Sequence, residues 1–178
     1  MCLGVAVSKN STPLGPYQDI GHPLLCNTVD PSVGYIGAHQ FYDVDGTPYL
    51  VWKSDDNSVG KNSMIHIRKL NADGVSFERT EPITTLLTAG YYWEWNIVEG
   101  AWMIHRNGYY YLFYSGNFFA SIYYAVGVAR SKDILGPYEK HGGPGINESI
   151  LHTNYNEYSE GKNTTFTSPG HCSVVEVN

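Results

Sequence analysis

Two glutamates stand among aromatic residues, where carboxyl groups could donate or accept protons on a bound sugar. Glu94 lies between Trp93 and Trp95, and Glu99 follows in the sequence Val98–Met103. The chain contains 15 Tyr, 4 Trp and 6 Phe, whose flat apolar faces and polar edges suit sugar rings, although most single aromatic residues only fill a β core. From position alone, a glutamate such as Glu99 is more often a surface or salt-bridged residue. A wider pattern is therefore needed.

Charge and apolar patterning exclude several classes of protein. The net charge is −6 and the basic residues are scattered, which is unlike the basic surface of a nucleic-acid-binding protein. No apolar run approaches the roughly 18–20 residues that cross a bilayer. The first residues, Met1–Val7, lack both the basic start and the apolar length of a signal peptide. We expect no nucleic-acid partner and no membrane span.

The cysteines and the glycosylation motifs leave the cellular compartment open. The chain has three cysteines, Cys2, Cys26 and Cys172. An odd count without metal-binding spacing predicts neither a disulfide framework nor a zinc site. Either one bridge forms, or all three remain buried thiols. Asn-x-Ser/Thr motifs fit a secreted protein but are common by chance; they begin at Asn10, Asn147 and Asn163.

The sequence repeats with a period near sixty residues, which points to an array of similar units. The sequence Leu-Gly-Pro-Tyr ends at both Tyr17 and Tyr138, which are 121 positions apart. An Asp-Gly pair ends at Gly46 and an Asn-Gly pair ends at Gly108, 62 positions later. The first separation is about twice the second.

Each unit has the pattern of a small antiparallel sheet. The Asp-Gly and Asn-Gly pairs are typical of tight turns that need positive φ. We expect these turns to separate strand 38–43 from 49–53 and strand 101–105 from 109–115. Further strands are expected over 64–70, 123–131 and 138–141. Three to four strands in sixty residues, without helical periodicity, predict radially arranged blades. A β-sandwich with irregular loops is the alternative.

The predicted fold class is therefore all-β. The chain would contain the outer part of one blade (5–20), two complete blades (38–83 and 98–141) and the start of another (168–177). A closed ring of four or five such blades needs far more than 178 residues. We therefore expect a propeller piece with exposed strand edges.

The sequence resembles glycoside hydrolase family 43, the five-bladed β-propellers that cleave arabinose- and xylose-containing polysaccharides. The Gly-Pro-Tyr blade ends carry this resemblance together with Gln40–Asp55, Val98–Gly116, Val126–Tyr138 and Ser168–Glu176. It implies about three of five blades and an inverting mechanism with an Asp base, an Asp that orients and tunes the acid, and a Glu general acid. Inversion needs one carboxyl to protonate the leaving oxygen and another, ~6.5–9.5 Å away, to activate water.

By this resemblance, Glu99 is the general acid at the inner start of a blade. The place of the tuning Asp falls on Gly37. An Asp-Pro pair earlier in the chain makes Asp30 the alternative candidate, although Asp30 could be a plain turn residue. We expect Asp43 and Asp45 to form the tight turn, and Glu94, which lacks the motif, to be a loop or subsite residue.

The resemblance places the base Asp in the first blade, and this sequence does not supply it. Within Met1–Gly21 the only candidate is Asp19, which follows a blade-end Gly-Pro-Tyr and is therefore expected at the periphery. Without a base to activate water, an acid alone leaves little hydrolysis.

Several residues are candidates for binding. His171, in a Pro-Gly-His sequence, matches a histidine that faces the central channel of the family and, directly or through water, a bound calcium; a packed or surface histidine is the plainer interpretation. Calcium takes mainly oxygen ligands, so spacing cannot reveal its site. His39 could point into the same channel. The candidate sugar platforms are Trp93, Trp95 and Phe118, while Trp102 could be a platform or core.

We therefore expect a glycosidase for arabinose- and xylose-containing plant polysaccharides, in a chain that lacks its base. The alternative is a non-catalytic carbohydrate-binding or degenerate propeller, which the missing base and Gly37 favour. A chain that does not fold alone is a third possibility. The resemblance implies no required cofactor, an oligo- or polysaccharide partner, a monomer if folded, and secretion of the full-length parent.

Overall fold

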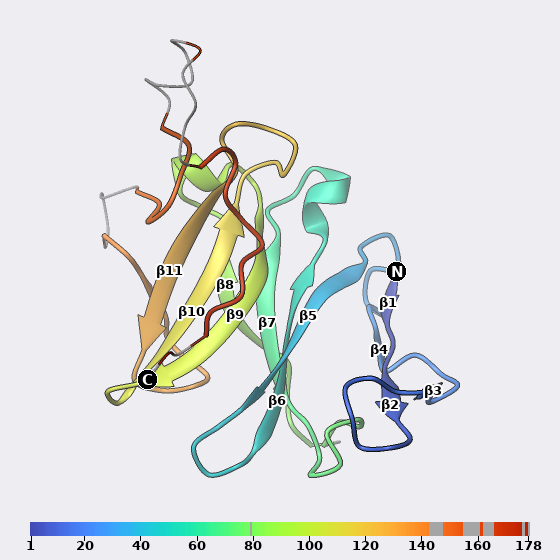
Figure 1. Cartoon of the computed structure of the whole chain (residues 1–178). Helices are drawn as coiled ribbons and strands as arrows, with labels where there is room; N and C mark the ends of the chain where they lie inside the picture. Colours follow the sequence, from blue (N-terminus) through green and yellow to red (C-terminus); the bar gives the residue numbers. More distant parts are fainter. Residues whose placement is uncertain (79, 143–147, 155–160, 162–165, 176, 178) are drawn as a thin grey trace.

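The computed structural model describes residues 1–178 except 79, 143–147, 155–160, 162–165, 176 and 178. The regular secondary structure of the described part consists almost entirely of antiparallel strands, which form four separate sheets (Figure 1). The predicted all-β fold class is confirmed. The strands are β1 (Cys2–Leu3), β2 (Ala6–Ser8), β3 (Tyr17–Asp19), β4 (Leu25–Cys26), β5 (Tyr35–Tyr42), β6 (Pro48–Ser54), β7 (Met64–Lys69), β8 (Thr84–Thr88), β9 (Val98–Arg106), β10 (Tyr109–Gly116), β11 (Ala125–Ser131) and β12 (Glu139–Lys140). Two 3₁₀ helices, η1 (Asp56–Val59) and η2 (Tyr92–Glu94), precede β7 and β9.

Two four-stranded sheets have the up-and-down order expected of successive blades. Their orders are β5-β6-β7-β8 and β12-β11-β10-β9, and they lie side by side (Figure 1). Gly46 and Gly108 adopt φ of 84° and 75° in the predicted tight turns. Strand β8 begins at Thr84, just after residue 83, where the sequence pattern ended the first blade. An Asp-Gly turn with φ of 68° at Gly74 follows β7, but β8 begins only at Thr84, so this turn does not mark the start of the strand.

A bulge of the same kind interrupts the first strand of each sheet. The register shifts between Ile36 and His39 in β5, and opposite Tyr114 in β9. Gly37 and Gly100 lie in these bulges with φ of 61° and 59°, which glycine adopts without steric cost. Gly37 therefore has a backbone role in the first blade, equivalent to that of Gly100 in the second.

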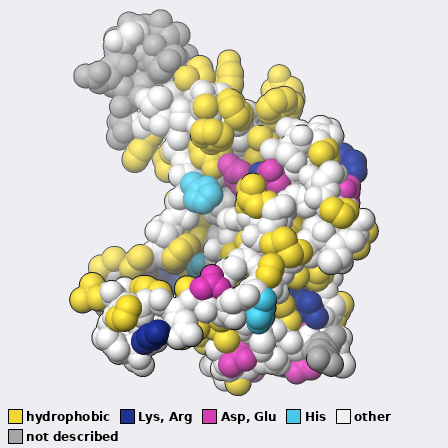
Figure 2. Space-filling model, turned by 90° about the vertical axis from the view of Figure 1, so that its right-hand side faces the viewer, with side chains coloured by type: hydrophobic (Ala, Val, Ile, Leu, Met, Phe, Trp, Pro, Cys, Tyr) yellow, Lys and Arg dark blue, Asp and Glu magenta, His cyan; other side chains and the backbone are white. Residues whose placement is uncertain are grey.

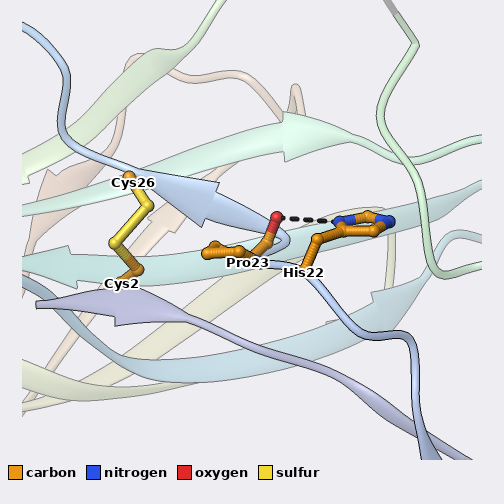
Figure 3. Close-up of a disulfide and its surroundings, with 4 residues drawn as sticks. All are labelled: Cys2, His22, Pro23 and Cys26. Carbon is orange, nitrogen blue, oxygen red and sulfur yellow. Dashed lines mark hydrogen bonds between the residues drawn. A yellow bond between two sulfur atoms is a disulfide. The ribbon is translucent and has the colours of Figure 1, made fainter.

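The N-terminal residues form two small hairpins beside the first blade. Sheets β1-β4 and β2-β3 are each antiparallel, and the backbone N–H of Tyr35 donates to the carbonyl of Met1. A disulfide joins Cys2 to Cys26 across β1 and β4 (Figure 3). Of the two alternatives left open by the odd cysteine count, the structure contains one bridge and a free Cys172.

Strand β6 is buried on both faces. Its residues alternate between two cores, as the period of two in a strand requires. Trp52 and Leu50 pack with Tyr35 and Leu70 toward the N-terminal hairpins. Val51 packs on the other side in the core between the two blades, with Ile65, Ile67, Val98, Met103, Leu112 and Tyr114.

Polar contacts fix the two blades at several levels. The hydroxyl of Ser63 accepts a hydrogen bond from the N–H of Val98 and donates to its carbonyl. Tyr110 donates to Asp43 over 2.7 Å, so this turn residue also joins the blades. Lys140 donates to the carbonyl of Thr88 over 2.8 Å.

The C-terminal segment crosses the second blade without forming a strand in its described residues, 166–175 and 177 (Figure 1). The expected start of another blade over 168–177 stays a prediction. Asn147 and Asn163 lie outside the described residues, whereas Asn10 is exposed. Within the part of the chain that is described, no helix has the length and apolar character needed to cross a membrane.

A buried polar network lies at the end of β6. Ser54 donates to Asp56, and His66 contacts Ser54 through Nε2 and Thr85 through Nδ1, at 3.0 and 3.1 Å. The hydroxyl of Ser54 donates its proton to Asp56 and not to His66, and Ser54, Asp56 and His66 are all buried. These residues therefore form a structural network and not a nucleophilic triad.

Burial lowers the pKa of His66 below its ordinary value of 6.5, although the charge of Asp56 acts in the opposite direction. The folded protein therefore binds a proton at His66 less readily than the unfolded chain does. His39 has a pKa lowered by burial as well. Stability should be complete above about pH 6.5 and should fall as the pH drops through 6.5.

Urea unfolding between pH 7.5 and 5 measures this dependence. The variant His66→Gln should show a shallower loss of stability over that range, whereas the exposed His22→Gln should follow the parent. A parent protein whose unfolding midpoint is the same throughout would contradict the prediction.

Candidate active site

Glu99 lies on β9 directly before the bulge at Gly100. A bulge redirects the side chains beside it, and the Glu99 side chain is turned to a cavity while keeping 15% exposure. Ile36 occupies the position before the equivalent bulge of the first blade and lines the same cavity. The same glycine bulge thus directs an apolar side chain, Ile36, into the cavity from the first blade and an acidic one, Glu99, from the second.

Both oxygens of Glu99 accept hydrogen bonds. The ammonium of Lys53 lies 2.8 Å from Oε2, and the hydroxyl of Tyr124 lies 2.8 Å from Oε1. Burial, and then the charge of Glu99, raise the pKa of Tyr124 far above its ordinary value. Tyr124 therefore remains a hydrogen-bond donor at any physiological pH.

Lys53 has a second carboxylate partner. Its side chain is only 3% exposed, and Oδ1 of Asp55 also lies 2.8 Å from the ammonium. Lys53 and Asp55 point to the same side because they are two residues apart at the end of β6. A buried ammonium without a partner is strongly destabilising, so the two carboxylates hold this charge in place.

The cavity around these groups has a volume of about 630 Å³. Besides the acidic and basic groups it is lined by Ile97, Phe118, Phe119 and His171, among others. The amide oxygen of Asn57, also on the cavity wall, is buried and has no hydrogen-bond partner among the described residues. Figure 2 shows acidic, basic and histidine side chains close together below a gathering of hydrophobic side chains.

The structure brings together three of the residues chosen from the sequence. Glu99, Phe118 and His171 line one cavity. His39 lines a smaller neighbouring cavity of about 190 Å³, which shares His171. His39 stacks on Trp102 with ring centres 4.2 Å apart, and its Nε2 is buried without a partner in the described chain.

Trp102 lines the smaller cavity, whereas Asp30, Trp93, Glu94 and Trp95 line neither. Asp30 caps a turn through Ser32, pairs with Lys61 over 3.5 Å and is 40% exposed, as expected of the plain turn residue. The structure does not bring it to Glu99. Trp93 packs against the core and stacks on Tyr114, which favours a structural role.

Glu94 is fully buried and holds the loop that carries both tryptophans. Its carboxylate accepts from Tyr114, Lys140 and the backbone N–H groups of Gly90 and Tyr91. This is the pattern of a structural carboxylate and not of a subsite. Trp95 is 63% exposed beyond the end of η2, where it could meet a ligand outside the cavity.

Lys53, Asp55 and Tyr124 were missed by the sequence analysis. One signal was available, since Lys53 lies near the end of the largely apolar strand β6 and an aspartate follows two residues later. A lysine in such a strand needs an anionic partner. Nothing in the sequence indicated that the partner would lie 46 residues away.

The described side chains near His171 offer few oxygen ligands for calcium. Among the described residues, no group of three or more His, Cys, Asp or Glu side chains could hold a metal ion. The small cavity offers mainly imidazole, thiol and aromatic groups, whereas calcium takes six to eight oxygens. Burial also raises the pKa of the Cys172 thiol. Calcium bound largely by water stays a prediction.

Comparison with known proteins identifies the chain. The family model for glycosyl hydrolases family 43 matches residues 1–178. The chain belongs to this family. A relative of the family-43 chain, the β-D-galactofuranosidase xynD of Aspergillus niger, is 30% identical over 173 residues, which are 97% of the chain and 42% of that protein.

Solved structures of family-43 type share the fold. A thermostable family-43 glycoside hydrolase matches with a TM-score of 0.75 at 30% identity, covering 96% of the chain and 51% of that structure. An endo-1,4-β-xylanase from Bacteroides thetaiotaomicron matches with a TM-score of 0.73 at 27% identity, covering 97% and 52%. The family-43 chain thus spans about half the length of the relatives it matches.

Gly170 and His171 of the C-terminal segment pack tightly against one side of the candidate site. The N–H of His171 donates to Ser115 over 2.6 Å, and a Cβ at Gly100 would lie 3.1 Å from Cα of His171. A Cβ at Gly170 would clash with the ring of Tyr124. Because Tyr124 is buried and donates to Glu99, the ring cannot yield without disturbing Glu99.

We therefore expect Gly170→Ala to destabilise the protein by about 1–3 kcal/mol through overpacking. Gly4→Ala is the matched control, because a Cβ there meets nothing within 4 Å, and its effect should stay within about 0.5 kcal/mol. Denaturant unfolding of both variants measures the difference. Equal stabilities would show that the segment is not packed on Tyr124 as described.

Proposed function

We propose that the protein containing this chain hydrolyses O-glycosidic bonds in arabinose- and xylose-containing plant polysaccharides by inversion, with Glu99 as general acid. The observation that supports this most is the position of Glu99. Its carboxylate is aimed into a cavity lined partly by aromatic side chains, and both of its oxygens accept hydrogen bonds. A glycoside seated there would place its leaving oxygen against Glu99.

In this mechanism Glu99 gives its proton to the leaving oxygen as the glycosidic bond breaks. Lys53 and Tyr124 keep the carboxyl in one orientation, and they stabilise the carboxylate that forms. Phe118 and Phe119 offer apolar faces to the sugar. The unpartnered amide oxygen of Asn57 can accept a hydrogen bond from a sugar hydroxyl.

Asp55 does not have the geometry of the base. Since one ammonium lies 2.8 Å from both Asp55 and Glu99, these two oxygens are no further apart than twice that distance. An inverting pair stands ~6.5–9.5 Å apart with room for water, and here Lys53 fills the intervening space. Among the described residues of the cavity wall there is no further carboxylate, so we assign water activation to a carboxylate outside this set.

The substrate class rests on the relatives. Proteins named as a β-D-galactofuranosidase, an endo-1,4-β-xylanase and an α-L-arabinofuranosidase are among them, which supports a substrate that contains furanose or xylose units. The disulfide between Cys2 and Cys26 supports a location of the protein in an oxidising compartment, because such bonds persist mainly outside the cytosol. We therefore propose that the protein acts outside the cell.

Azide can replace base-activated water and so tests the acid separately. In the 178-residue chain, azide should attack the anomeric carbon of an alkyl arabinofuranoside, xyloside or galactofuranoside while Glu99 protonates the departing alcohol. The variant Glu99→Gln should lower the rate of glycosyl azide formation by about 10²–10⁴-fold. The control Glu139→Gln changes an exposed carboxylate on β12 and should keep the parent rate. An unchanged rate in Glu99→Gln would remove Glu99 from this role.

Non-catalytic carbohydrate binding is the second candidate function, favoured by the absence of a carboxylate at inverting distance among the described cavity residues. Xylo- and arabino-oligosaccharides should then quench tryptophan fluorescence without product release. Phe118→Ala should weaken binding about tenfold. Phe166→Ala is the matched control, since Phe166 is similarly exposed and does not line the cavity. Equal affinities in both variants would argue against this binding site.

A further inference from the structure

One buried ammonium serves two carboxylates at the candidate site. Lys53 is 3% exposed, Glu99 is 15% exposed and Asp55 is 22% exposed. With both carboxylates ionised, the group of three side chains has one negative charge in excess. Binding of one proton makes this group neutral. The proton can reside on Glu99 only if the Lys53 ammonium keeps Asp55 as a charged partner.

A proton donor must exist in two states during turnover. When Glu99 is ionised, it pairs with Lys53 directly. When Glu99 carries a proton, its attraction for the ammonium is greatly reduced, and a lysine buried to this extent would be left as an uncompensated charge. Asp55 removes that difficulty because its oxygen already lies 2.8 Å from the same ammonium.

We propose that Asp55 is a positioning residue for Glu99 that acts through Lys53, keeping the ammonium paired while Glu99 holds its proton. The proposal rests on the proposed role of Glu99 as an acid. Asp55 is the more exposed of the two carboxylates, so solvent helps it to remain charged.

The local backbone favours this role. Lys53 and Asp55 point to the cavity, and the alternate residues Ser54 and Asp56 point to the buried network with His66. The N–H of Asp55 donates to the carbonyl of Gly34 over 2.8 Å. The end of β6 is thus fixed from both sides, which holds Asp55 and Lys53 in one arrangement.

The other polar and titratable groups that face Glu99 are few. Tyr124, which precedes β11, donates to the opposite oxygen, and His171 of the C-terminal segment lines the same cavity. Neither contacts Lys53 in any described interaction. Substitution of Asp55 therefore changes the charge seen by Glu99 through the lysine and also directly, because both carboxylates lie 2.8 Å from the same ammonium.

Carboxyl ¹³C NMR of the 178-residue chain tests the proposal without requiring hydrolysis. The Glu99 signal is assigned by its loss in Glu99→Gln. In Asp55→Asn, the ammonium has only Glu99 as partner, so protonation of Glu99 should move to lower pH by about one unit. In Lys53→Met it should move to higher pH by a similar amount. Asp73→Asn, an exposed turn aspartate away from the cavity, should leave the signal unchanged.

The proposal is overturned if protonation of Glu99 in folded Asp55→Asn matches that of the parent, or if Lys53→Met moves it to lower pH. Circular dichroism verifies the fold of each variant, and Lys53→Met supplies an independent shift of opposite sign should Asp55→Asn fail to fold. Failure of the proposed function has a different signature. In that case Glu99→Gln keeps the rate of azide transfer, while the two NMR shifts occur as predicted.

Discussion

A buried ammonium that must be paired is the constraint on which the candidate site depends. Lys53 is the penultimate residue of strand β6, which is enclosed on both faces, so water cannot solvate its charge. Its partners come from its own strand end and from the neighbouring blade. The ion pair with Glu99 therefore joins the blades at the cavity, while Ser63, Tyr110 and Lys140 join them elsewhere. Relative movement of the blades would break all of these contacts together.

The repeated backbone explains how one position acquires chemistry. Both blades bend at a glycine with positive φ, Gly37 or Gly100, and both present the preceding residue to the same cavity. In the first blade that residue is Ile36, and in the second it is Glu99. The fold thus supplies two equivalent positions, and the side chain alone decides which of them can exchange a proton. Glycine at position 37 is consistent with this bend and does not by itself mark a degenerate site.

The features predicted from sequence are those encoded locally. Strand alternation and the turns at Gly46 and Gly108 require only neighbouring residues, and the all-β class followed from them. Features that join distant segments were not accessible. The pair of Lys53 with Glu99 spans two blades, and three cysteines could not reveal the bond between Cys2 and Cys26. Trp93 resembled a sugar platform, but Gly116 and Gly127 open space for its ring inside the blade.

The arrangement around Glu99 suits both sugar binding and acid catalysis, and the two functions differ in whether Glu99 must carry a proton. A carboxylate whose oxygens accept from Lys53 and Tyr124 can still accept a hydrogen bond from a sugar hydroxyl, and for this it should remain charged. An acid must instead give up part of its attraction to Lys53. With Glu99 as the sole partner of the ammonium, the charged state would dominate and the site would favour binding. Asp55 makes the neutral state accessible, so the second carboxylate is the feature that distinguishes a proton donor from a ligand-binding glutamate at this position.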